Sequence, residues 1–160
     1  MDMRQARLSG LELRIPPLAV AVGTGAIMWL TAAVLPAWTI RFGGHRVLAA
    51  VCAALAAVVV AAGLVSFRRA RTTSNPLRPD AASALVITGI YRHTRNPMYL
   101  GFALALLAWA VWLAQPLALL GVPAFVAWMN RFQIAPEERA LAALFGDAFA
   151  HYCREVRRWV

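Results

Sequence analysis

Two clusters of polar side chains stand out in a chain that is otherwise mostly apolar. The first is the stretch from Thr88 to Gly101, T-G-I-Y-R-H-T-R-N-P-M-Y-L-G, which brings cations, an amide and two tyrosines close together. The second consists of Glu137, Glu138 and Arg139. Arginine in one cluster and carboxylate in the other can hold opposite ends of one zwitterionic ligand through charge-assisted hydrogen bonds. We therefore predict a single binding site built from both clusters.

In the first cluster, the order Arg95-Asn96-Pro97 indicates the start of a helix. A residue that precedes proline favours an extended backbone, and proline is tolerated in a first helical turn. The N-terminus of such a helix offers backbone N–H groups to an anion. Arg92, Arg95 and Tyr99 also have a second interpretation, because arginine and tyrosine anchor helices at a membrane surface.

In the second cluster, Pro136 followed by two acids predicts a helix start, with both acids near the positive end of the helix dipole. Neighbouring residues on a helix point about 100° apart. One of Glu137 and Glu138 can therefore serve the dipole while the other faces a ligand, and the sequence leaves open which. Apolar residues then recur every three or four positions, which predicts amphipathic helices over residues 136–159 with a break at Gly146.

The elements that position these clusters are apolar enough to cross a membrane. Hydrophobic residues make up 61% of the chain and charged residues only 14%, unlike an ordinary soluble domain. Since about 20 apolar residues cross a hydrocarbon core of ~30 Å, we predict one domain with four membrane-spanning helices. These lie at about residues 15–35, 47–67, 98–114 and 117–132.

The fold class is therefore all-α and polytopic, with a turn at Gln115-Pro116 between the last two helices. The loop 68–97 and the C-terminal helices 136–159 are expected to form a cap at one membrane surface. Within that loop the apolar stretch from Ala84 to Ile87 predicts an ordered segment that docks on another element.

The distribution of the basic residues indicates membrane topology rather than a nucleic-acid partner. The chain has 16 basic residues, all of them arginine. Segments 1–14, 68–98 and 130–160 contain all but Arg41 and Arg46, so the positive-inside rule places both termini and the loop in the cytoplasm. Topology explains this bias, and we expect no nucleic acid as a partner.

The remaining reactive side chains follow no catalytic or metal-binding pattern. Cys52 lies in an apolar run and Cys153 in the polar C-terminal segment, so we do not expect a disulfide between them. We expect His93, His151 and Cys153 to be surface residues, and we predict no metal site.

The two clusters together resemble a known family. G-I-Y-R-H-T-R-N-P-M-Y-L-G, followed about forty residues later by P-E-E-R-x-L-x-x-x-F-G-x-x-F-x-x-Y, is similar to the isoprenylcysteine carboxyl methyltransferase and phospholipid methyltransferase family of integral-membrane enzymes. The resemblance covers roughly Thr72 to Trp159. It is closest to the short bacterial members, which have asparagine at the position of Asn96 where the eukaryotic carboxyl methyltransferases have histidine.

The resemblance implies an S-adenosylmethionine site on the cytoplasmic face of a bacterial inner membrane. The substrate would be a lipid-like or isoprenoid-bearing molecule, such as a prenylated one, reached from the membrane lipid. Arg95 and Glu138 would act most directly in the reaction. The positions that match the family's cofactor motifs and their supporting pattern are Gly89, Tyr91, Arg95, Asn96, Pro97, Tyr99, Glu137, Glu138, Arg139, Phe145 and Tyr152.

The chemistry of this cofactor agrees with the absence of a histidine–acid pair from these motifs. A sulfonium methyl donor is already activated, so a protein has to hold it in line with a nucleophile and exclude water. The acceptor atom stays open.

Two alternatives remain at this stage. A sterol-reductase-like membrane oxidoreductase would use NADPH and could bind its 2′-phosphate through Arg68, Arg69 and Arg71. A four-helix transporter or scaffold is the other, although transporters usually carry an ionisable residue within a span. The predicted spans contain no acid, and their one base is Arg131 at the end of the last span.

Overall fold

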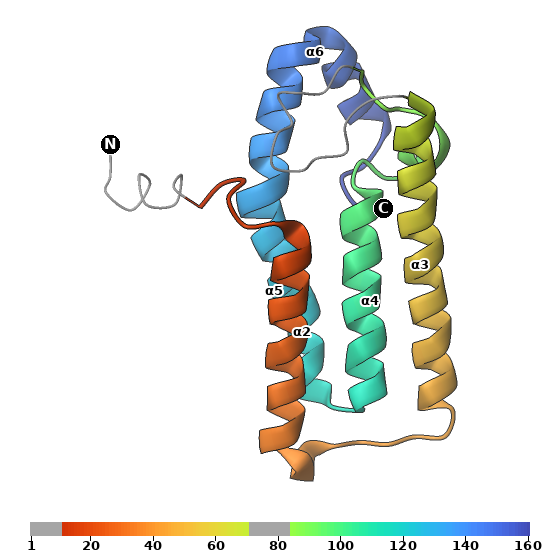
Figure 1. The fold of residues 1–160 in the computed structure, drawn as a ribbon, viewed down its shortest axis with the longest axis vertical. Helices are drawn as coiled ribbons and strands as arrows, with labels where there is room; N and C mark the ends of the chain where they lie inside the picture. The colour runs from red at the N-terminus through yellow and green to blue at the C-terminus, as the bar shows by residue number, and fades with distance from the viewer. Residues whose placement is uncertain (1–10, 71–83) are drawn as a thin grey trace.

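The computed structural model describes residues 11–70 and 84–160, and within these ranges the chain forms helices and no strand (Figure 1). The all-α, polytopic fold class is confirmed. The long helices are α2 (Pro17–Val34), α3 (His45–Ala70), α4 (Pro97–Leu113), α5 (Gly121–Trp128) and α6 (Ala135–Glu155). Residues 71–83 of the predicted loop, including Arg71, lie outside the described residues.

Helix α4 is the centre of the bundle, because it packs against α2, α3 and α5 (Figure 1). Its closest neighbour is α3, and Gly101 explains how the two approach. A Cβ atom at Gly101 would lie 2.3 Å from Cγ2 of Val60 and 3.2 Å from the carbonyl oxygen of Ala56. Small residues permit such close backbone contact between membrane helices.

The length and surface of these helices suit a membrane. The helices α2 and α3 and the segment from Pro116 to Glu155 are long and apolar enough to span one, and α4 is a shorter apolar helix of 17 residues. Large apolar side chains are exposed on α2 and α3, where lipid rather than water would cover them. Among these are Val22, Ile27, Val51 and Val58.

The turn at Gln115-Pro116 is confirmed. Ala114 ends α4 in a left-handed conformation with φ of 52°, and the 3₁₀ segment Pro116–Leu120 leads into α5. The buried side chain of Gln115 donates to the carbonyl oxygen of Leu35 at 2.9 Å and accepts from the N–H of Leu117 at 3.4 Å. One amide therefore joins this turn to the end of α2.

Helix α6 begins at Ala135 with Pro136 and both acids in its first turn, as predicted, but this start is not a free helix N-terminus. Helix α5 continues through a π-helical segment, Met129–Ile134, directly into α6, and Ile134 and Ala135 keep helical backbone angles. The N–H of Ala135 donates to the carbonyl oxygen of Asn130, the i→i−5 pattern of a π-helix. Proline has no N–H to donate in a helix interior, and a local change of helix type accommodates it. Glu137 and Glu138 therefore lie two and three residues into a helix that has no free N-terminus here.

The predicted break at Gly146 is confirmed, since its φ of 48° and ψ of −124° kink α6. The C-terminal end differs from the prediction, because α6 stops at Glu155 and residues 156–160 are not helical. These residues turn back toward the start of α4 (Figure 1). The indole N–H of Trp159 donates to the side-chain oxygen of Asn130 at 3.0 Å. This interaction fastens the tail to the π-helical segment.

Candidate functional site

Residues 84–96, the described part of the loop before α4, contain a short 3₁₀ helix, Gly89–Arg92. Gly89 has φ of +64°, and a Cβ atom there would lie 2.7 Å from Oγ of Ser66 on α3. Both the backbone angle and the contact require glycine. Tyr91 is buried, with its ring edge-on to Phe67 at a centroid distance of 5.4 Å.

The second half of α6 packs on this segment. The hydroxyl of Tyr152 donates to the carbonyl oxygen of Tyr91 at 2.7 Å. Leu85 and Phe145 pack against the buried cluster of Phe149, Tyr152 and Val156. The prediction that Ala84 to Ile87 docks on another element is thus confirmed.

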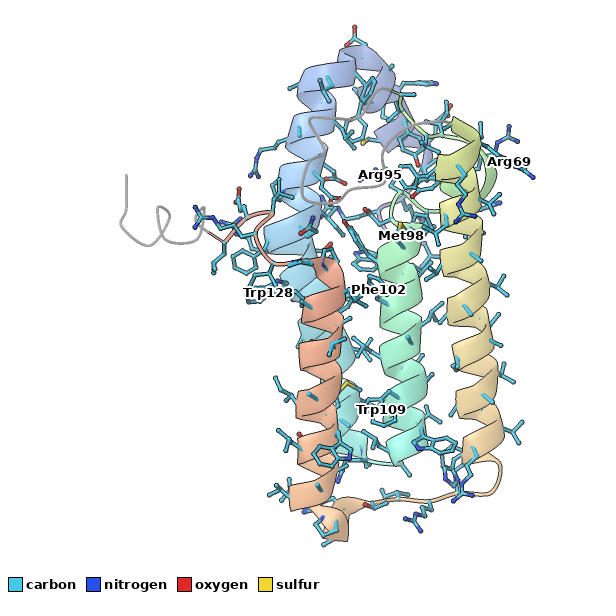
Figure 2. The ribbon with its side chains drawn as sticks, viewed as in Figure 1. Arg69, Arg95, Met98, Phe102, Trp109 and Trp128 are labelled. Carbon is cyan, nitrogen blue, oxygen red and sulfur yellow. The ribbon has the colours of Figure 1, made fainter. Side chains whose placement is uncertain are left out.

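Arg95 stands where the start of α4 meets α6 and the C-terminal tail (Figure 2). Its guanidinium donates to Oε1 of Glu138 at 2.8 Å and to the carbonyl oxygens of Cys153 and Val156 at 3.1 and 2.8 Å. Its backbone N–H donates to the carbonyl oxygen of Arg157 at 3.0 Å. The side-chain Nε–H is buried and has no partner among the described residues.

Glu138 is held between two arginines. Its second partner is Arg158 of the tail, which donates to Oε1 at 3.1 Å and to Oε2 at 2.5 Å. Burial by itself would raise the pKa of Glu138, but the hydrogen bonds from Arg158 and Arg95 outweigh it and lower the pKa below its usual value. The carboxylate is therefore charged at neutral pH, and the side chains of Arg95 and Glu138 are only 14% and 21% exposed.

Asn96 and Thr94 secure the same tail. The amide of Asn96 and the hydroxyl of Thr94 both donate to the carbonyl oxygen of Arg158, at 3.0 and 3.3 Å. The backbone N–H of Asn96 in turn donates to the hydroxyl oxygen of Thr94. Pro97 follows as the first residue of α4, as predicted.

Glu137 faces a different group of partners. Its Oε1 accepts from the hydroxyl of Tyr99 and from the amide of Gln133, the latter at 2.6 Å. Exposed arginines at 131 and 139 place this part of the helix beyond the apolar segment. Burial raises the pKa of Glu137 from 4.5 to about 7, although the hydrogen bonds from Gln133 and Tyr99 act in the opposite direction.

The structure therefore brings most of the predicted residues together at the α6 end of the bundle. Arg139 is the exception, because it is 60% exposed and pairs on the outer surface with Glu12. The two predicted clusters contact each other directly through Arg95 and Glu138, which are 43 residues apart in sequence.

The sequence analysis did not identify Gln133 and Arg158 as members of this network. Gln133 precedes Glu137 by four residues, and the i, i+4 spacing on a continuous helix could have identified it. Arg158 contacts Glu138 only because residues 156–160 fold back, which no local pattern indicates.

A surface pocket of about 350 Å³ lies beside this network. It is lined by residues 87–88, Arg92, Tyr152 and Glu155, among others, and so lies between the loop and the second half of α6. His93 and His151 are exposed, as predicted. Cys153 is half-buried, contrary to prediction, because it packs against Phe149 and Tyr152. Neither cysteine forms a disulfide.

The fold and the site define a helical integral-membrane protein with an ordered network of charged residues at one end of its bundle. Residues 44–148 match the phospholipid methyltransferase family, and the chain belongs to that family. It is a membrane methyltransferase of the phospholipid and isoprenylcysteine kind. The match spans α3, α4, α5 and the first part of α6, and therefore includes both polar clusters.

The chain is also similar to an uncharacterized protein of Haemophilus influenzae (strain ATCC 51907 / DSM 11121 / KW20 / Rd). The two are 51% identical over 63 residues, which is 39% of this chain and the whole of that protein. No solved structure matches the chain.

Proposed function

We propose that this methyltransferase uses S-adenosylmethionine and acts on a lipid-like or isoprenoid-bearing substrate, at a site that faces the bacterial cytoplasm. The observation that carries the proposal is the contact between the two motif clusters. Arg95 meets Glu138 at 2.8 Å, and Tyr99 meets Glu137 by a hydrogen bond, so cationic and anionic groups converge on one place. A zwitterionic cofactor needs both kinds of group.

Arg95 fits the carboxylate of this cofactor. Its Nε–H is a buried donor without a partner among the described residues, and leaving such a donor unpaired costs about 1–3 kcal/mol. A carboxylate is the acceptor that an arginine binds best. Its two terminal nitrogens meanwhile bind Glu138 and the carbonyl oxygens of Cys153 and Val156.

The two acids fit different parts of a ligand. Both hydrogen bonds to Glu137 reach Oε1, and none of the described residues donates to its Oε2. That oxygen is available to an ammonium group or a ribose hydroxyl. Glu138 already accepts three bonds from Arg95 and Arg158. We therefore assign Glu137 as the acid that binds the ligand, and Glu138 as the acid that orients Arg95.

The bound cofactor supplies an activated methyl group, and the protein has to bind, orient and shield it. The aromatic side chains of Tyr91 and Tyr152 form an apolar wall on the loop side, and the pocket next to Tyr152 offers room for the nucleoside part. Residues 156–160 accept hydrogen bonds from Arg95 and Asn96, and this contact would help to keep water from the network. An apolar acceptor would enter from the lipid that surrounds α2 and α3.

The oxidoreductase alternative gains no support. Of the three arginines proposed to bind a 2′-phosphate, Arg68 and Arg69 are exposed at the end of α3, and Arg71 lies outside the described residues. The family match favours methyl transfer over both reduction and transport.

Calorimetry on the purified protein in detergent tests the proposal. We expect S-adenosylmethionine to bind and NADPH not to bind, and we expect transfer of a labelled methyl group to an extractable lipid. Binding of NADPH without binding of S-adenosylmethionine would refute the methyltransferase assignment.

A pair of variants then tests the site. Arg95→Lys keeps a cation but loses the Nε donor, and we expect a ten- to hundredfold weaker affinity, as one charge-assisted hydrogen bond of about 1.5–3 kcal/mol implies. Arg154→Lys, at an exposed position on α6, is the matched control and should bind as the parent does. Equal affinity in both variants would mean that Arg95 only supports the C-terminal tail.

A further inference from the structure

Residues 11–14 contact the junction between the π-helical segment Met129–Ile134 and α6. The backbone N–H of Leu13 donates to the carbonyl oxygen of Phe132 at 3.1 Å. In a regular α-helix that carbonyl would accept from the residue four positions later, which is Pro136 and has no N–H. Leu13 thus supplies the donor that the proline lacks.

Glu12 adds two ion pairs at the same place. Its carboxylate contacts Arg131 at 2.7 Å through one oxygen and Arg139 at 2.5 Å through the other. These arginines lie eight residues apart and on opposite sides of the junction between the π-helical segment and α6. Glu12 is only 17% exposed, although the arginines are 46% and 60% exposed. One partly buried carboxylate therefore joins the two sides of the junction.

The backbone of this segment also indicates a specific docked conformation. Leu13 has φ of 56°, in the left-handed region that side chains other than glycine rarely adopt. Arg14 closes a turn onto the carbonyl oxygen of Leu11. A residue keeps such a conformation when the surrounding contacts hold it there.

The junction decides which way the acids point. A π-helical turn contains one residue more than an α-helical turn, so a change between the two rotates every later residue by about 100°. Such a rotation would turn Glu137 away from Tyr99 and Glu138 away from Arg95. The contacts on the outer face thus control the geometry on the inner face.

We propose that residues 11–14 are a positioning strap for the binding site, and that Glu12 is its positioning residue. The strap holds the junction in its π-helical form and thereby orients Glu137 and Glu138. It lies outside residues 44–148, the part of the chain that matches the family. The inference rests on the proposed function, because the ligand whose affinity it controls is S-adenosylmethionine.

The test compares Glu12→Gln with Asp147→Asn, which removes the same charge from an exposed position on α6. The measurement is the Kd of S-adenosylmethionine on the folded, full-length protein. We expect Glu12→Gln to raise the Kd about two- to tenfold, the range that two partly exposed ion pairs can supply. Asp147→Asn should leave it unchanged, and Glu12→Asp, which keeps the charge, should recover part of the loss. Hydrogen exchange should also become faster at the Leu13 amide and over residues 129–139 in Glu12→Gln.

The outcomes separate the two proposals. If the parent protein does not bind S-adenosylmethionine, the proposed function fails, and hydrogen exchange still decides whether Glu12 holds the junction. If the parent binds and Glu12→Gln binds equally well, the strap has no positioning role, even where the variant is less heat-stable. An equal loss of affinity in Asp147→Asn would show a general effect of charge and would also refute the proposed role of residues 11–14.

Discussion

The buried carboxylate of Glu137 predicts a specific dependence of stability on pH. Its pKa is raised from 4.5 to about 7 in the folded protein, mainly by burial. Below about pH 4.5 the group is protonated in both the folded and the unfolded states and has no effect. Between pH 4.5 and 7 only the folded protein keeps the proton, so the free energy of unfolding falls as the pH rises. Above about pH 7 the carboxylate is ionised in the folded protein as well, and the loss in the free energy of unfolding is complete.

The size of the penalty follows from the shift. A difference of about 2.5 pKa units at 1.36 kcal/mol per unit gives about 3 kcal/mol. Glu137→Gln keeps the shape and an oxygen that can accept from Tyr99, but it cannot ionise. We therefore expect the variant to be about as stable as the parent near pH 4.5 and more stable than the parent at pH 8. The shift in Tm between these conditions should be on the order of 5 to 10 °C for a protein of this size.

Thermal unfolding in one detergent at half-unit steps from pH 4.5 to 8 measures this difference. Glu138 does not interfere, because its pKa is lowered and its effect on stability is lost only below about pH 4.5. Asp147→Asn, at an exposed position on α6, is the control and should follow the parent. A constant difference in Tm between Glu137→Gln and the parent across this range would show that Glu137 does not titrate there, and would refute the reasoning.

Three further predictions concern the loop and the topology. Gly89→Ala should destabilise the protein by about 1–3 kcal/mol, because alanine is strained at this backbone angle and its Cβ would meet Oγ of Ser66. Chemical denaturation of Gly89→Ala, with and without Ser66→Ala, separates the two causes. An unchanged denaturation midpoint in Gly89→Ala would contradict both. Tyr152→Phe should lower the free energy of unfolding by about 1–3 kcal/mol and loosen the loop, because the carbonyl oxygen of Tyr91 loses its donor. Limited proteolysis of the loop measures this effect, and an unchanged cleavage rate would count against it. A reporter fused after Val160 should be active in the cytoplasm, as the arginine distribution predicts, and activity outside would show an odd number of spans.

The helices and the meeting of the two clusters could be predicted because both depend on local patterns. Apolar runs of membrane-spanning length indicate helices wherever they occur. The turn at Gln115-Pro116 brings Arg95 and Glu138 to the same end of a helical hairpin. The kink at Gly146 could be predicted as well, because glycine adopts backbone angles that break a helix.

The contacts within the site could not be predicted in the same way. Asn96 and Arg158 interact because the last five residues fold back, and the sequence shows only a short basic tail there. The partners of Glu137 depend on the face of α6 that points inward. That face depends on the π-helical segment, which has no sequence signature of its own.

Pro136 shows why the local pattern predicted the start of α6 but not the helical segment that precedes it. Proline in a first helical turn and proline inside a long helix look the same in sequence, because both simply lack one N–H. The difference lies in what satisfies the carbonyl four residues earlier, and here the N–H of Leu13 does so from the far end of the chain. Pro136 thus creates an acceptor for the N-terminal segment as well as an irregular helix. Because Glu137 and Glu138 follow directly, the orientation of both acids depends on that distant contact.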